Sequence, residues 1–406
     1  MRDQSKIHSR NADSSTSANR LWLIILLGSL SAFGPLSLDM YLPAFPTISR
    51  ELHTSTSLVQ LSLTACMIGL SVGQLLAGAL SDIQGRRRPL LIFLAIYGIS
   101  SVLCAFAPSI GVLVALRFIQ GFAGAAGIVI SRAIVRDLYS GPELTKFFAM
   151  LMLVNGAAPI FAPIAGGQLL KITSWEGVFI VLAVWGVLML AAVFFGMPET
   201  LGPEKRLAGG LRQTMSTFGI LLGDRYFMGY ALAQGLVMAA MFAYIAGSPF
   251  VLQNLYGVTP QGFSLLFAMN GLGIIIFGQI TGRLAAKLRE QRLFTVGLGI
   301  AAAAGVILLL MIIIEAPLTA ILIPLFFVVS SVGIISTTGF SLAMRKNAHA
   351  AGSASALLGL LSFTLGGMMA PLVGLSGDAN ALPMGISIAV AELGAVACYL
   401  LLIKGK

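Results

Sequence analysis

Two carboxylic acids and one arginine lie inside long apolar stretches of the sequence, at Asp39, Arg117 and Glu392. An ionisable side chain near the middle of a bilayer costs about 2.5 to 3.5 kcal/mol on the insertion scale, so such residues are usually paired or functional. Asp39 is the 19th residue of a stretch that begins at position 21, and Arg117 comes about seven residues into a stretch that runs the opposite way. At about 1.5 Å per residue, both side chains reach similar depths. The spacing predicts that Asp39 and Arg117 communicate, directly or through water and substrate, and form a proton-coupling site.

Each of the three residues also has a simpler explanation. Asp39 stands four residues before Pro43 and could cap the outer end of its helix. Arg117 could extend to the lipid headgroups, because long basic side chains snorkel toward water. Glu392 could stay neutral at the edge of a helix bundle or meet a partner chain, so its role is left open.

A short polar segment, GALSDIQGRRR at 78–88, joins two of the apolar stretches. Its glycines permit close helix approach and a tight turn. Its aspartate can accept from arginine or lie at a helix N-terminus, where a carboxylate is favoured by about 0.3 to 1 kcal/mol. We predict an inner gate that holds two halves of the molecule together in the outward-facing state; the alternative is that the arginines serve only membrane topology. The residues of this gate are Gly78, Asp82, Gly85, Arg86, Arg87 and Arg88.

The stretch APIFAPIAGG at 158–167 combines prolines with small residues. Proline removes a backbone donor and bends a helix, while small residues let helices pack closely. The pattern predicts a bent, closely packed helix, although each residue taken alone also fits ordinary packing. The residues concerned are Pro159, Pro163, Gly166 and Gly167.

A pocket for a small organic molecule needs mostly apolar and aromatic side chains with a few polar groups. The sequence offers candidates of both kinds inside the apolar stretches, although each alone fits packing as well as ligand contact. The candidate substrate-binding residues are Met40, Tyr41, Gln120, Asn155, Gln234, Phe242, Tyr244 and Asn270.

The elements that position these residues must be membrane-spanning helices. Of the 406 residues, 57% are hydrophobic and 10% charged, with a mean hydropathy of +0.94, whereas a soluble domain carries about 25% charged residues. The predicted fold class is therefore an all-α integral membrane protein with twelve transmembrane helices in two halves of six. The predicted spans are 21–43, 57–80, 89–108, 111–134, 143–169, 177–196, 227–252, 261–284, 293–314, 317–342, 351–375 and 382–403.

The distribution of charge predicts the topology. The formal net charge of +10 comes from Lys and Arg that gather in the loops of one side, which the positive-inside rule places in the cytoplasm together with both termini. Residues 1–20 are predicted to be a disordered cytoplasmic tail, and no signal peptide is expected because no cleavage site follows. The halves are 21–196 and 227–406, joined by a cytoplasmic loop at 197–226.

The two halves have similar sequence segments, and some of these segments resemble motifs of a known family. GQLLAGALSDIQGRRR at 73–88 is similar to GQITGRLAAKLREQR at 278–292, at an offset of 204 to 205 positions. Two parallel six-helix repeats facing a midplane cavity are the architecture of major facilitator transporters. The loop motif, LRFIQGFAG at 116–124 and APIFAPIAGG resemble motifs of that superfamily. Together with LDMYLPAFP at 38–46 and SPFVLQNLYGV at 248–258, they resemble the bicyclomycin-resistance (Bcr/CflA) type of drug:proton antiporter.

The resemblance implies a function. It implies proton-driven export, by alternating access, of drug-like molecules of the bicyclomycin, chloramphenicol or sulfonamide class across a bacterial cytoplasmic (inner) membrane. Ala158 and Ala162 stand where the antiporter motif usually has Gly, which leaves the direction of transport less secure. The expected partners are small-molecule drugs, protons and the lipid bilayer, with no nucleic acid, no cofactor and no metal, and the chain is expected to be a monomer.

Other function classes find less support in the sequence. An intramembrane enzyme lacks an HExxH motif, a Cys/His cluster or paired intramembrane carboxylates, and an ATP-driven machine lacks GxxxxGK[ST]. A channel would need a ring of selectivity residues. The remaining alternative is a proton-coupled importer or facilitator of a small metabolite on the same fold.

Overall fold

The computed structural model describes residues 22–139, 141–206, 218–345, 351–374 and 380–404, and every regular element in this part of the chain is helical. The first span, Trp22–Glu51, includes α2 (Phe33–Asp39), η1 (Leu42–Ala44) and α3 (Phe45–Glu51). It is followed by α4 (Thr56–Gln84), α5 (Arg87–Ala105), α6 (Ile110–Leu138), α7 (Gly141–Leu169) and α8 (Trp175–Gly196). After the turn η2 (Pro203–Lys205) come α10 (Arg225–Phe250) with η3 (Val251–Leu255), α11 (Pro260–Leu284), α12 (Glu290–Ile313), α13 (Leu318–Met344), α14 (Ala351–Val373), and α15 (Leu382–Tyr399) with η5 (Leu400–Lys404).

Each of the twelve predicted spans falls on one helical segment. Ten of these segments are long and apolar enough to cross a membrane, judged on the described residues alone. The first span was predicted to end at residue 43, which is wrong, because helical structure continues to Glu51. Pro43 and Pro46 stand in the first turns of η1 and α3, where a missing N–H costs no hydrogen bond. The prolines therefore bend the chain without ending the span.

Local capping explains where several helices begin. Ser55 caps α4 by accepting from the Leu58 N–H at 3.4 Å, and Thr259 caps α11 by accepting from Gly262 at 3.1 Å. Asp224 caps α10 through the Tyr226 N–H at 2.9 Å. Such side chains satisfy the orphan donors of a first helical turn.

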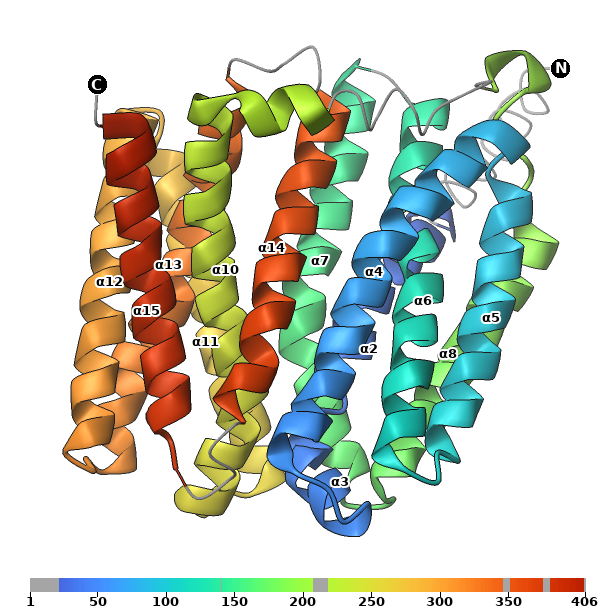
Figure 1. The fold of residues 1–406 in the computed structure, drawn as a ribbon. Coiled ribbons are helices and arrows are strands. Elements are labelled where there is room, and N and C mark those ends of the chain that lie inside the picture. Colours follow the sequence, from blue (N-terminus) through green and yellow to red (C-terminus); the bar gives the residue numbers. More distant parts are fainter. Residues whose placement is uncertain (1–21, 140, 207–217, 346–350, 375–379, 405–406) are drawn as a thin grey trace, which may run out of the picture.

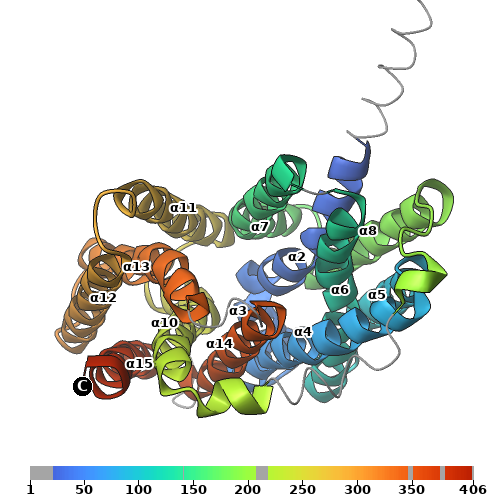
Figure 2. The same ribbon diagram turned by 90° about the horizontal axis from the view of Figure 1, so that it is seen from above.

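The helices form two groups that lie side by side (Figure 1). The first span and α4 to α8 make one group, and α10 to α15 make the other. Seen from above, α4 lies beside α14 and α7 beside α11 along the boundary (Figure 2). We call the end that carries the α4–α5 and α11–α12 turns the inner end, after the orientation predicted from charge, and the opposite end the outer end.

The largest hydrophobic cluster is shared between the two groups and lies toward the outer end. One cluster of buried side chains belongs wholly to the first group and a second has all its core members in the second group. The third, largest cluster joins both, with Tyr41, Phe45 and Phe179 from the first group and Tyr244 and Phe250 from the second.

Hydrogen bonds between the groups follow the same pattern. Six side chains near the outer end donate to main-chain oxygens of the opposite group, whereas the side-chain hydrogen bonds found at the inner end of the described chain stay within one group. The structure is therefore closed at the outer end, an inward-facing arrangement. The six bonds are Ser57 to Pro371 (3.0 Å), Gln60 to Ala246 (3.0 Å), Thr64 to Gly367 (3.0 Å), Gln253 to Pro43 (3.2 Å), Gln261 to Gly167 (2.7 Å) and Ser264 to Pro163 (2.7 Å).

The Pro/Gly motif of α7 lies at this closed end. Pro159 and Pro163 are inside the helix, and the main-chain oxygen of Met40 lies where a side chain on Gly166 would be. Any larger residue at 166 would push α7 away from the segment that carries Asp39. The motif packs α7 closely against both groups, as small residues do in membrane interfaces.

Candidate proton-coupling and substrate site

Asp39 ends α2 at the boundary between the two groups. Its side chain is buried, and it forms no hydrogen bond or ion pair with any other described residue. Its carboxyl group lies within electrostatic range of Cys66 on α4 and Tyr244 on α10, one from each group. An unpaired buried carboxyl at the boundary between the two groups is a candidate for a functional site.

Arg117 on α6 is completely buried and binds the segment around Asp39. Its guanidinium donates to the main-chain oxygen of Ser37 at 2.6 Å and to the side-chain oxygen of Gln120. It also lies over the rings of Tyr41, 4.2 Å from the centroid, and Phe179, 5.6 Å away. The side chain reaches no surface of the described chain, so snorkelling to headgroups does not describe this arrangement.

A second shell of polar contacts fixes Arg117 and its partners. Gln120 donates to Ser101 on α5 at 2.7 Å, and Ser37 shares a hydrogen bond with Tyr97 at 2.8 Å. Tyr41 shares one with Ser62 on α4 at 3.1 Å. The guanidinium therefore joins the first span to α4, α5 and α6.

The direct pairing of Asp39 with Arg117 is absent among the ion pairs of the described residues. The guanidinium instead bonds the main-chain oxygen of Ser37, two residues before Asp39. A coupling between them passes through the intervening backbone and Tyr41, or through water and substrate, and stays a prediction.

The candidate substrate residues lie in two places. Met40 and Tyr41 are buried beside Asp39, and Tyr244 accepts from Asn270 at 2.9 Å while stacking on Phe267. These side chains gather under the closed outer end.

The other candidates lie elsewhere. Phe242 packs against Phe363, with ring centroids 5.8 Å apart. Gln234 lies beside Gly339, and its side-chain oxygen is buried without a hydrogen-bond partner in the described chain. Gln120 is occupied by Arg117, and the side chain of Asn155 lies outside the described part of the structure.

The loop motif forms an ionic network at the inner end of the first group. Arg86 is buried and bonds Asp82 at 2.5 Å, Asp137 at the end of α6 at 2.7 and 3.2 Å, and Ser81 at 2.9 Å. The two carboxylates outweigh the effect of burial and raise the pKa of Arg86.

The remaining residues of the loop motif have other roles. Gly85 has φ of +94°, which glycine alone adopts without strain. Gly78 faces Val129 of α6, and Arg88 is exposed.

Glu199, just after α8, accepts hydrogen bonds from the start of α5. Its carboxylate accepts from the backbone N–H groups of Arg86 (2.8 Å), Arg87 (3.2 Å), Thr200 (3.0 Å) and Leu201 (3.0 Å). Partial burial raises the pKa of Glu199, but these four donors outweigh it and hold the pKa below its usual value. The carboxylate thereby neutralises the positive end of α5.

The network does not link the two groups in this conformation. Its hydrogen bonds join α4, α5, α6 and the segment after α8, and within the described residues none reaches α10 to α15. The predicted gate between halves is therefore not formed here, and its role in the opposite conformation stays a prediction.

Comparison with known proteins identifies the family. The sequence model of the Major Facilitator Superfamily matches residues 25–371. The chain belongs to the Major Facilitator Superfamily. It is therefore a multi-pass membrane transporter, and the predicted fold class is confirmed.

Several bacterial transporters are similar to this superfamily member. It is 47% identical to the uncharacterized transporter YdgK of Bacillus subtilis over 95% of this chain and 96% of that protein. It is 31% identical to a bicyclomycin resistance protein homolog of Haemophilus influenzae over 93% and 94% of the two chains. A chloramphenicol resistance protein of Pseudomonas aeruginosa is 28% identical over 86% and 82%.

Solved structures share the fold of this superfamily member at low sequence identity. The nucleoside transporter NupG has a TM-score of 0.77 at 11% identity and covers 95% of this chain and 100% of its own. A partially occluded inward-open structure of the xylose transporter XylE from E. coli has a TM-score of 0.67 at 17% identity, covering 94% and 99%.

Sequence reasoning missed two acids of the loop network, Asp137 and Glu199. Asp82 pairs with Arg86 of the same segment. Asp137 stands one residue beyond Arg136 and was hidden among topology charges. A signal for Glu199 was its position directly after a long apolar stretch, where a carboxylate can reach the start of a neighbouring helix.

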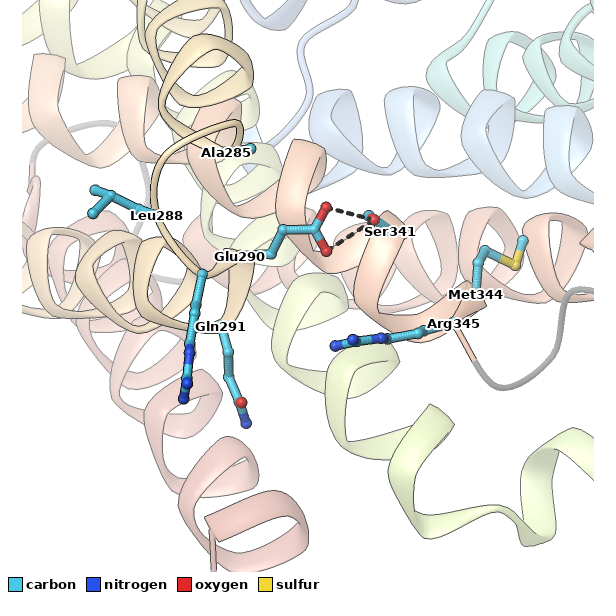
Figure 3. Close-up of a pocket in the computed structure, with 8 residues that line it drawn as sticks. Ala285, Leu288, Glu290, Gln291, Ser341, Met344 and Arg345 are labelled. Carbon is cyan, nitrogen blue, oxygen red and sulfur yellow. Dashed lines mark hydrogen bonds between the residues drawn. The ribbon is translucent and has the colours of Figure 1, made fainter.

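The second half of the transporter holds a different pair at the positions that correspond to Arg86 and Asp137. Glu290 and Ser341 stand 204 positions after Arg86 and Asp137, and Ser341 donates to the Glu290 carboxylate at 3.0 and 3.1 Å (Figure 3). Around them a cavity of about 880 Å³ opens at the inner end. It is lined by Ala285, Leu288, Arg289, Glu290, Gln291, Ser341, Met344 and Arg345. The described residues hold no group of three or more His, Cys, Asp or Glu that could bind a metal.

Proposed function

We propose that this transporter exports drug-like small molecules in exchange for protons, with Asp39 as the exchanged carboxyl group. It does so as a monomer in the bacterial cytoplasmic membrane, with both termini in the cytoplasm. Arg117 positions the Asp39 segment, and Met40, Tyr41, Tyr244 and Asn270 line the site that drug and proton share.

The observation that carries the proposal is the placement of Asp39. It is a buried carboxyl without an ionic partner among the described residues, and it lies within electrostatic range of Cys66 on α4 of one group and Tyr244 on α10 of the other. Opening of the outer end separates these helices and exposes the carboxyl to the outer solution. A site that is alternately buried and exposed can bind a proton on one side and release it on the other.

The relatives support the substrate class. Two of them are named for resistance to bicyclomycin and to chloramphenicol, which are neutral drug-sized molecules. The buried aromatic side chains around Asp39 suit such ligands, because drug pockets are mainly apolar with few polar groups. One proton moved inward for each neutral drug supplies about 2.3 kcal/mol per 100 mV, enough for more than a tenfold drug gradient.

The test is the direction and energy source of transport. We expect cells that produce this protein to accumulate less chloramphenicol than control cells, and a protonophore to abolish the difference. Inside-out vesicles should take up chloramphenicol when acidified internally. Uptake into intact cells that follows the proton gradient would favour the alternative of a proton-coupled importer, and gradient-independent equilibration would favour a facilitator.

A further inference from the structure

A second carboxyl group, Glu392 on α15, is buried away from the site described above. It is 0% exposed, and neither of its carboxyl oxygens has a hydrogen-bond partner in the described part of the chain. Gly305 of α12 lies directly opposite, since a methyl group at that position would be 3.5 Å from Cγ of Glu392. A buried polar group without any partner is rare in native proteins and calls for an explanation.

No charged side chain lies at the level of Glu392 on the helices that pack against α15. On α12 the charged residues are Glu290 and Arg292 in its first turn, 13 or more residues from Gly305. On α10 the charged residue is Arg225 at its start, and its other titratable side chains are Tyr226, Tyr230 and Tyr244. The sequence of α14 contains no titratable residue, α15 itself adds Cys398 and Tyr399, and η5 ends at Lys404, 12 residues beyond Glu392.

This environment determines the protonation state of Glu392. A carboxylate here would be an unpaired charge among apolar side chains, which is far more costly than a neutral acid. Glu392 therefore holds a proton in the inward-facing conformation. Its position would be better filled by an apolar residue if the carboxyl had only a packing role.

One helix connects this acid with Asp39. Helix α10 packs against α15 along much of its length and also contacts η1, α3 and α4 of the first group. Its outer part carries Tyr244, within electrostatic range of Asp39, and Ala246, whose main-chain oxygen accepts from Gln60 across the boundary. When the outer contacts open, α10 must move, and its packing on α15 changes with it.

We propose that Glu392 is a second proton-binding carboxyl group of the transport cycle. It takes a proton from the outer solution while the outer end is open and carries it into the inward-facing state. When chloramphenicol binds and α10 begins to re-pack against α15, the carboxyl gives this proton to water on the cytoplasmic side, so that one proton moves inward and the carboxylate is ready to bind the next one when the outer end opens. The proposal rests on the proposed proton-coupled function and adds one proton per cycle to the one exchanged at Asp39.

The experiment uses the full chain, purified and reconstituted, with chloramphenicol as the probe. Infrared spectra of wild type minus Glu392→Gln isolate the C=O band of a protonated Glu392. We expect this band at neutral pH, and we expect it to shift in D₂O, faster when chloramphenicol is present. The ratio of protons to chloramphenicol transported should fall by one in Glu392→Gln and return to the wild-type value in Glu392→Asp. The control Glu315→Gln removes an exposed carboxyl and should change neither the infrared band nor the proton ratio.

A Glu392 band that never shifts in D₂O with chloramphenicol present would overturn the proposal, as would an unchanged proton ratio in Glu392→Gln. The deuterium test does not depend on drug export. If wild type moves no protons with chloramphenicol while the band still exchanges, the proposed function fails and the exchange of Glu392 stands. If wild type exports with protons and Glu392→Gln matches it, only the inference about Glu392 fails.

Discussion

The two halves of this transporter use similar helices but distribute charge differently. In the first half, Asp39 lies at the boundary, Arg117 is buried within the first group and bonds the segment before Asp39, and Arg86 joins two carboxylates at the inner end. In the second half the only Asp, Glu, Lys or Arg well inside a span, among those that the structure describes, is Glu392, and the positions that correspond to Arg86 and Asp137 hold the Glu290–Ser341 pair. Since the backbone architecture repeats while the charges do not, we expect proton coupling and gating to depend mainly on the first half. The predictions below test this asymmetry.

The largest effect is expected from Asp39→Asn. The amide keeps the size of the side chain but cannot exchange a proton, so efflux driven by a pH gradient in proteoliposomes should fall about tenfold or more. The protein should still insert, and it should still bind chloramphenicol in detergent. As a control, Glu204→Gln removes an exposed carboxyl and should transport normally. Full active efflux by Asp39→Asn would reject the role of Asp39.

The second-largest effect is expected from Arg117→Met. The substitution leaves the Ser37 carbonyl and the Gln120 side chain buried without their donor, at about 1 to 3 kcal/mol for each unsatisfied group. We expect a lower Tm in detergent together with strongly reduced efflux. Arg117→Lys keeps the positive charge but not the planar guanidinium, so its Tm and efflux should lie between those of wild type and Arg117→Met. A Met variant with wild-type Tm and transport would show that the buried guanidinium has no positioning role.

The loop network should show a graded response. The Asp137 side chain is 14% exposed and that of Asp82 is 40% exposed, and buried charge-assisted bonds contribute more than exposed ones. Asp137→Asn should therefore lower transport and Tm more than Asp82→Asn. Equal effects, or a larger effect at Asp82, would contradict the assignment of Asp137 as the main partner of Arg86.

Glu199 makes the inner end of the first half sensitive to acid. Because its pKa in the folded protein lies below the usual value, its stabilising effect is fully present above the unfolded pKa of about 4.3 and is lost as pH falls through the folded pKa. The Tm difference between wild type and Glu199→Gln should be constant near neutral pH and shrink in acid. A Tm difference between wild type and Glu199→Gln that grows as the pH falls would contradict a stabilising Glu199 carboxylate.

The smallest effect is expected in the second half. Ser341→Ala removes a hydroxyl that donates to Glu290 beside an open cavity, and water can replace it. Transport and Tm should change little, well below the effect of Asp137→Asn at the corresponding position. A loss of transport as large as that of Asp137→Asn would show that both halves gate equally.

The sequence by itself determined the helical fold and the repeat, because apolar stretches of span length have few alternatives in a bilayer. It also singled out Asp39, Arg117 and the loop motif, because buried charge and glycine at a turn are costly choices. Hydropathy could not show that Pro43 and Pro46 bend the first span without ending it, since that depends on where each proline falls in a helical turn.

Only the tertiary structure decided which groups meet. It paired Arg86 with Asp137, 51 positions away, and Glu199 with the start of α5, more than 110 positions away. It also left Asp39 without an ion pair to Arg117 and Glu392 without a hydrogen-bond partner in the described chain. Depth along a helix can be read from residue spacing, but the direction of a side chain around the helix, and the neighbour it meets there, depend on how all twelve helices pack.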